Sequence, residues 1–114
     1  MKTLNIFLLV VIFTTFDVKS AKDTFYLYLE SHLFYPSELV IPANKKVKLI
    51  IENKDSTPEE FDSFDLNREK VIYPGRKVTI YIGPLKPGRY EYFGEFNPNT
   101  ALGTIIVESD RHVH

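Results

Sequence analysis

Acidic residues crowd one short stretch of the chain. Glu59, Glu60, Asp62 and Asp65 lie within a seven-residue span. Carboxylate oxygens are hard ligands that suit Fe(III), Mn(II), Ca(II) or Mg(II), whereas Cu(II) needs additional nitrogen donors. The stretch is therefore a candidate metal site.

The same cluster has a plainer interpretation. Charged side chains on an edge strand prevent sheets from aggregating, and Arg68 and Lys70 could pair with part of the cluster. In an extended segment Glu60 and Asp62 share one face while Glu59 lies on the other, so only a subset can converge on one ion. If the carboxylates lie close together with no lysine or arginine between them, their unpaired charges indicate a metal site. If the Arg68 or Lys70 side chain lies between them, the cluster has a structural role.

The three histidines are the only source of imidazole nitrogen. His32 follows Glu30 in a predicted loop, where an exposed side chain is the simpler interpretation. His112 and His114 form a terminal His-x-His pair beside Asp110, a pattern that binds Cu(II) or Ni(II) weakly. No Ser-His-Asp set and no glycine-rich phosphate loop is present, so we predict that the protein is not an enzyme.

Composition excludes several classes of protein. The 114 residues carry 14 Lys and Arg against 15 Asp and Glu, a formal net charge of −1 that gives no electrostatic case for nucleic-acid binding. There is no cysteine, and Met1 is the only methionine. The thiolate and thioether ligands of blue copper and of iron–sulfur clusters are therefore missing.

The N-terminal segment has the features of a secretory signal peptide. Lys2 precedes an apolar run at 4–16 that is too short for a comfortable membrane span, and Val18 and Ser20 suit positions −3 and −1 of a cleavage site. The alternatives are an uncleaved anchor and a buried N-terminal helix. We expect a secreted or periplasmic protein, with a signal peptide at 1–20, one domain at 21–110 and a C-terminal tail at 111–114.

Short alternating segments separated by turn signals predict an all-β domain. Apolar residues occupy alternate positions in 46–52 and 77–82, which is typical of strands buried on one face. The segment 60–66 is the least regular, because Phe61 and Phe64 cannot share a face of a regular strand, so a bulge or turn is expected there. Seven or eight strands predict a two-sheet Greek-key β-sandwich. The predicted strands are 24–30, 38–41, 46–52, 60–66, 70–73, 77–82, 89–93 and 104–108.

Tyrosine and glycine positions carry further expectations. Most of the seven tyrosines are expected in the core or at its border, with Tyr26 and Tyr81 as candidates for an exposed docking face. Gly94 is expected at a bulge or a close approach of two chain segments, and Gly103 at a turn into the last strand.

The order of these features resembles a cupredoxin over nearly the whole chain after residue 20. The sequence Phe-Tyr-Pro-Ser-Glu-Leu-Val-Ile-Pro occupies 34–42, and Pro-Gly-Arg-Tyr-Glu-Tyr-Phe at 87–93 precedes Gly-Thr-Ile-Ile-Val at 103–107. The segments 58–66 and 93–98 further resemble periplasmic cupredoxin-like domains of bacterial high-affinity iron uptake, including the N-terminal domain of EfeO-type proteins. The resemblance implies a domain that binds copper or iron and accompanies an iron permease.

The copper ligands of a blue-copper cupredoxin are replaced at every matching position. Where such a protein carries Pro-His, this chain carries Pro58 and Glu59. Gly94, Asn97 and, approximately, Ala101 stand at the positions of the Cys, His and Met ligands. We expect no type 1 copper centre, because the thiolate is obligatory for that site.

The resemblance also implies which residues could hold a metal instead. The loop that carries Glu95 and Asn97 reaches the end of a cupredoxin sandwich at which Glu59 stands. The predicted metal ligands are Glu59, Glu60, Asp62, Glu95 and Asn97.

Two functions follow from the sequence. The first is a secreted or periplasmic cupredoxin-like protein that binds Fe(III) or Cu(II) through carboxylates and is accessory to iron or copper uptake. The alternative is a metal-free cupredoxin-fold module that docks on a membrane iron permease or another envelope partner. No nucleic-acid partner is expected, and the oligomeric state is left open.

Overall fold

The computed structural model describes residue 3 and residues 22–109, and every regular element within them is a β-strand. No helix in this part of the chain is long and apolar enough to cross a membrane. The predicted signal peptide, apart from Thr3, and the predicted tail at 111–114 lie outside the described residues. The strands are β1 (Thr24–Glu30), β2 (Leu33–Tyr35), β3 (Glu38–Pro42), β4 (Val47–Asn53), β5 (Glu59–Ser63), β6 (Arg68–Ile72), β7 (Lys77–Ile82), β8 (Gly88–Gly94) and β9 (Leu102–Glu108).

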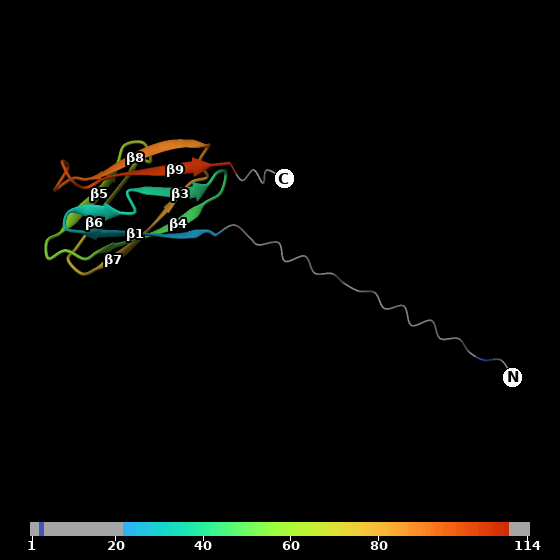
Figure 1. The fold of residues 1–114 in the computed structure, drawn as a ribbon, viewed down its shortest axis with the longest axis horizontal. Coiled ribbons are helices and arrows are strands. Elements are labelled where there is room, and N and C mark those ends of the chain that lie inside the picture. The colour runs from blue at the N-terminus through green and yellow to red at the C-terminus, as the bar shows by residue number, and fades with distance from the viewer. Residues whose placement is uncertain (1–2, 4–21, 110–114) are drawn as a thin grey trace.

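The strands form two sheets that pack face to face (Figure 1). One sheet has the order β2-β1-β4-β7, and the other has the order β3-β9-β8-β5-β6. β1 runs parallel to β4, and β3 runs parallel to β9, so each sheet joins segments that are distant in the sequence. The predicted all-β, two-sheet sandwich is confirmed.

Alternating burial along the strands explains how the sheets pack. Val47, Leu49 and Ile51 of β4 are almost fully buried, and the residues between them are partly exposed. Each predicted strand is present, although several bounds differ by one to three residues. β2 is an additional strand, and its three residues are too few for an alternating pattern to reveal.

The irregular segment around Phe61 ends a strand and begins a turn. β5 stops at Ser63, whose hydroxyl donates a hydrogen bond to the carbonyl oxygen of Glu91 (2.7 Å). Phe61 is fully buried, whereas Phe64 is 80% exposed and lies against Phe93, with ring centroids 5.5 Å apart. The prediction that the two phenylalanines do not share a face is confirmed.

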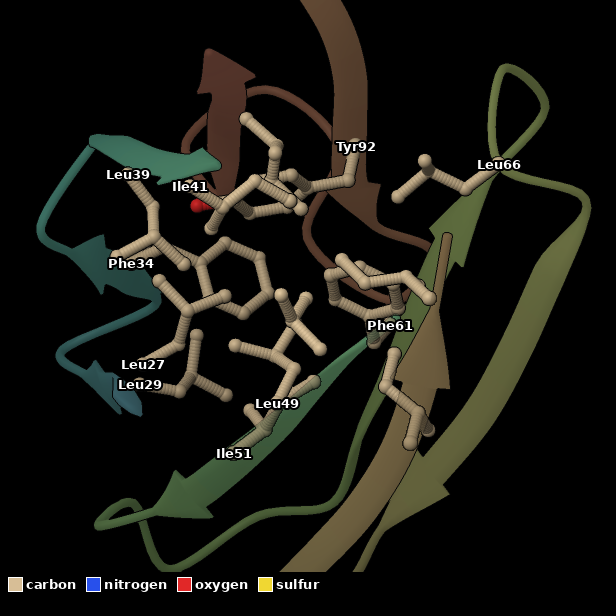
Figure 2. Close-up of a cluster of buried hydrophobic side chains, with 14 of the residues drawn as sticks. Leu27, Leu29, Phe34, Leu39, Ile41, Leu49, Ile51, Phe61, Leu66 and Tyr92 are labelled. Carbon is tan, nitrogen blue, oxygen red and sulfur yellow. The ribbon is translucent and has the colours of Figure 1, made fainter. Parts of the chain in front are cut away.

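Three aromatic rings from different strands meet in the core (Figure 2). The ring centroid of Tyr92 lies 5.1 Å from that of Phe34 and 5.0 Å from that of Phe61. Burial, helped by the charge of Glu91, raises the pKa of the Tyr92 hydroxyl well above its usual range. The Tyr92 hydroxyl donates to the carbonyl oxygen of Pro36 (3.4 Å). These contacts join the two sheets beneath the end that carries the acidic residues.

The expectations for the other tyrosines and for Gly103 need correction. Tyr92 is buried and Tyr90 packs against the core, but five tyrosines are exposed because they alternate outward on their strands or lie in a turn: Tyr26, Tyr28, Tyr35, Tyr73 and Tyr81. Gly103 lies inside β9, in register with Tyr92, and an added Cβ would overlap the Tyr92 ring. Its missing side chain therefore makes room for an aromatic ring and does not form a turn.

Candidate functional site

The carboxylate of Glu59 is buried at one end of the sandwich and accepts three hydrogen bonds. Glu59 opens β5 and is 1% exposed. Its Oε1 atom accepts the backbone N–H groups of Glu60 (2.9 Å) and Phe96 (2.8 Å), and its Oε2 atom accepts the Nδ2–H of Asn97 (2.7 Å). A buried charge is tolerated when it is hydrogen-bonded in this way. The carboxylate therefore ties β5 to the loop between β8 and β9.

Gly94 provides the space that the Glu59 carboxylate occupies. A Cβ atom on Gly94 would lie 2.6 Å from Cδ of Glu59 and 2.7 Å from Cβ of Ala101. The N–H of Gly94 donates to the carbonyl oxygen of Ala101 (2.7 Å), which brings the two ends of the loop together. The close approach predicted at Gly94 is confirmed, and Glu59 is the residue that approaches.

A second group of carboxylates lies on the outer face of the β5–β6 ladder. Phe61 faces the core, so its neighbours Glu60 and Asp62 face outward. Asp62 is paired in register with Glu69 of β6, which places both side chains on the same face. One oxygen each of Glu60, Asp62 and Glu69 lies within 4.8 Å of the other two. We call these three residues the outer carboxylate cluster.

Arg68 and Lys70 form no ion pair with the outer carboxylate cluster. The Arg68 guanidinium donates to three backbone carbonyl oxygens, including that of Asn67 at 3.0 Å. Lys70 is paired in register with Phe61, so it lies on the opposite face of the ladder from Asp62. The side-chain pairing that the sequence offered as a plainer explanation is not formed within residues 22–109.

The local electrostatics reflect this excess of negative charge. The pKa of Glu60 is raised above its ordinary value of 4.5. Partial loss of contact with water is the largest cause, and the charges of Glu69, Asp62, Glu95 and Glu59 act in the same direction. A cation among these carboxylates would relieve the repulsion.

The structure divides the predicted ligands into two groups. Glu59 and Asn97 are hydrogen-bonded to each other at the end of the sandwich, while Glu60 and Asp62 lie on the outer face. The backbone N–H of Glu95 donates to the carbonyl oxygen of Glu60 (2.9 Å), which keeps the Glu95 charge close to both groups. No single group contains all five residues.

The predicted ligands did not include Glu69, and Asp65 of the acidic stretch has a structural contact. Glu69 becomes a neighbour of Asp62 only through the register of β5 with β6, and that register depends on the turn at 64–67. Asp65 accepts the backbone N–H of Glu91 (2.8 Å) and fixes that turn against β8. A hairpin prediction that paired 59–63 with 68–72 would have identified Glu69.

The histidines form no comparable site in the described part of the chain. Nδ1 of His32 lies 3.6 Å from Oδ2 of Asp55, a carboxylate that also accepts the backbone N–H groups of Ser31 and His32. His32 therefore has one carboxylate neighbour, and it belongs to no cluster of three metal-ligating side chains within residues 22–109. His112 and His114 lie outside the described residues.

Residues 3–107 match the family of cupredoxin-like domains. The chain belongs to this cupredoxin-like family. It is 48% identical over 79 residues to the uncharacterized protein RP394 of Rickettsia prowazekii (strain Madrid E). That match covers 69% of this chain and 63% of RP394, so the chain spans less than two thirds of its relative.

Two solved structures share the fold at low sequence identity. Reduced auracyanin from Roseiflexus castenholzii is 14% identical with a TM-score of 0.63, and the match covers 78% of this chain and 99% of that one. The metal-binding domain of the Cu(I)-exporting ATPase CopA of Streptococcus pneumoniae D39, solved with Cu(I), is 12% identical with a TM-score of 0.68. That match covers 80% of this cupredoxin-like chain and 90% of the CopA domain.

The cupredoxin-like chain does not carry the donors of a type 1 copper centre. Glu59, Gly94, Asn97 and Ala101, which the sequence resemblance matches to blue-copper ligand positions, lie together at one end of the sandwich. However, the chain has no cysteine, so no thiolate is available. The Glu59 carboxylate, hydrogen-bonded to the protein, occupies the space beside Gly94.

Replacing Glu59 tests whether its hydrogen bonds hold β5 to the loop between β8 and β9. We expect Glu59→Ala to lower the free energy of unfolding by about 2 kcal/mol, because partly buried donors on the β8–β9 loop lose their acceptor. The matched control is Glu60→Ala, which removes the same side chain from the outer face and is expected to cost no stability. Denaturant unfolding measures both, and equal losses would contradict this role.

The raised pKa of Glu60 predicts a pH-dependent gain in stability for Glu60→Gln. A carboxyl whose pKa is higher in the folded state stabilises the fold at pH values below its ordinary pKa of 4.5, and this contribution is lost as the pH rises through the folded-state value. With cations removed by a chelator, Glu60→Gln should therefore raise the denaturation midpoint at pH 7, and the gain should disappear below pH 4.5. Glu108→Gln on β9 is the control, and a gain that persists in acid would contradict the electrostatic explanation.

Proposed function

We propose that this cupredoxin-like protein is secreted or periplasmic and binds a metal ion through carboxylate oxygens. Its metal is Fe(III) or Cu(II), carried as cargo for iron or copper uptake. The observation that carries the proposal is the outer carboxylate cluster, in which three carboxylates lie within 4.8 Å of one another. Neither Arg68 nor Lys70 forms an ion pair with it.

The chemistry of the donors supports metal binding over electron transfer. Oxygen ligands hold hard cations, while the thiolate that sets up a blue-copper redox centre is absent from the sequence. The proposed role is therefore to bind a metal and pass it to a membrane iron permease or another envelope protein. The resemblance of 58–66 and 93–98 to the domains of bacterial iron uptake supports iron as the cargo.

A metal-free interaction module is the second candidate function. It is favoured by Glu59, whose carboxylate is satisfied by protein donors at the end where a blue-copper protein holds its metal. It is also favoured by exposed tyrosines on the β2-β1-β4-β7 sheet. Tyr28 and Tyr81 lie beneath the ammonium groups of Lys54 (4.5 Å) and Lys46 (5.0 Å), which leaves an aromatic and basic face open to an envelope partner.

A chelator-competition titration distinguishes the two functions. The recombinant chain is titrated with Fe(III), Cu(II), Mn(II) and Zn(II) buffered by competing chelators. We expect a dissociation constant of about 1 µM or lower for at least one of the proposed metals, within the range of carboxylate sites in proteins. Cu(II) should bind without the intense thiolate-to-copper absorption of a blue-copper protein.

The double variant His112→Ala/His114→Ala is the control for the C-terminal histidines. Unchanged affinity in this variant supports carboxylate ligands, whereas loss of binding transfers the site to the C-terminal histidines. If the wild-type chain binds none of the metals, the metal proposal fails and the interaction module is the remaining account.

A further inference from the structure

We infer that the cation binds on the outer face of the β5–β6 ladder, held by Glu60, Asp62 and Glu69, and not at the end of the sandwich between Glu59 and Asn97. This inference rests on the proposed function and names its site. The ligand is a hard divalent or trivalent cation that accepts one oxygen from each carboxylate and completes its coordination with water.

The spacing of the three carboxylates suits a single ion. Ligand oxygens surround a hard cation at about 2.0–2.6 Å, so two oxygens on the same ion lie no more than about 5 Å apart. The oxygens of Glu60, Asp62 and Glu69 lie within 4.8 Å of one another, inside that limit for the larger ions, and the smaller ions draw the oxygens to within about 4 Å. Cross-strand pairing of Asp62 with Glu69 fixes two of them on rigid strands.

Asp62 is the observation that points to a ligand. It is only 6% exposed, yet no N–H group or basic side chain of the described residues hydrogen-bonds to its carboxylate. Asp62 lies directly opposite Glu69 on the neighbouring strand, and like charges in that arrangement are destabilising. A cation shared with Glu69 and Glu60 supplies the partner that Asp62 lacks.

The surroundings leave room for water to complete the coordination. A hollow of about 390 Å³ adjoins the cluster, and Asp62, Phe64, Arg68 and Glu69 are among the residues that line it. On the other side, Asp62 is in register with Phe93, against which Phe64 packs. The Asp62 side chain therefore borders a hollow that is open to solvent.

The alternative position between Glu59 and Asn97 is less suited to a cation. Oε1 of Glu59 already accepts two backbone N–H groups, and Oε2 accepts the Asn97 amide N–H. Binding there would break those hydrogen bonds and leave partly buried donors without an acceptor. At the outer carboxylate cluster no such bond to a carboxylate has to be broken.

The test compares two variants that remove equal charge near Glu60. Glu69→Gln removes a proposed ligand, whereas Glu95→Gln removes a nearby charge that is not a ligand. Both charges act on Glu60, so both variants weaken the negative field around it. Metal affinity is measured by chelator competition with Mn(II) and Fe(III), and denaturant unfolding confirms that each variant folds.

We expect Glu69→Gln and Asp62→Asn each to weaken binding by at least about ten-fold, the loss that follows even from removing a residue that supports a metal ligand. Glu95→Gln should weaken binding by no more than about three-fold, because it changes only a screened field. Equal losses of affinity in Glu69→Gln and Glu95→Gln would overturn the inference. They would mean that the overall negative charge attracts the cation and that no specific carboxylates bind it. Undiminished binding in Glu69→Gln and Asp62→Asn would overturn it while leaving the proposed function in place.

Mn(II) also reports the position of the site directly. Because Mn(II) is paramagnetic, it broadens the NMR signals of nearby amides. We expect the amides of Asp62, Glu69 and Phe93 to broaden before those of Phe96 and Asn97. The reverse order would place the ion at the Glu59 end, and absence of any binding by the wild-type chain would end both the inference and the proposed function.

Discussion

The buried hydrogen bonds of Glu59 determine how the acidic end of this sandwich is built. Its carboxylate joins the first residue of β5 to the loop between β8 and β9, using Phe96 and Asn97 as donors. Gly94 has no side chain, and the carboxylate occupies the space where one would lie. A negative group bonded to the protein thus fills the space beside Gly94, and the absence of cysteine excludes a type 1 copper centre.

Strand geometry then separates the remaining carboxylates from Glu59. Successive residues of β5 point to opposite sides of the sheet, so the inward position of Glu59 sends Glu60 and Asp62 outward. The register with β6 adds Glu69 to the same face and sends Lys70 to the other. The chain therefore combines an internally satisfied anion at one end with a cluster of unneutralised carboxylates on its flank.

Local patterns were sufficient to predict most of the fold, but only two of the three residues of the outer carboxylate cluster. Alternation in β4 and β7 identified the strands, and the mismatch between Phe61 and Phe64 identified the turn after β5. Glu69 could not be found in the same way, because its contact with Asp62 depends on pairing between strands. The hydrogen bonds of Glu59 depend on a loop 37 residues further along the chain, which a local pattern cannot report.

The central claim is that the flank of the sandwich, and not its end, holds the cation. A crystal of the protein soaked with Mn(II), with anomalous scattering recorded to locate the ion, tests this most directly. The account predicts one anomalous peak within coordination distance of Glu60, Asp62 and Glu69, with Glu59 still hydrogen-bonded to Asn97. A peak between Glu59 and Asn97, with the outer carboxylate cluster empty, would contradict it.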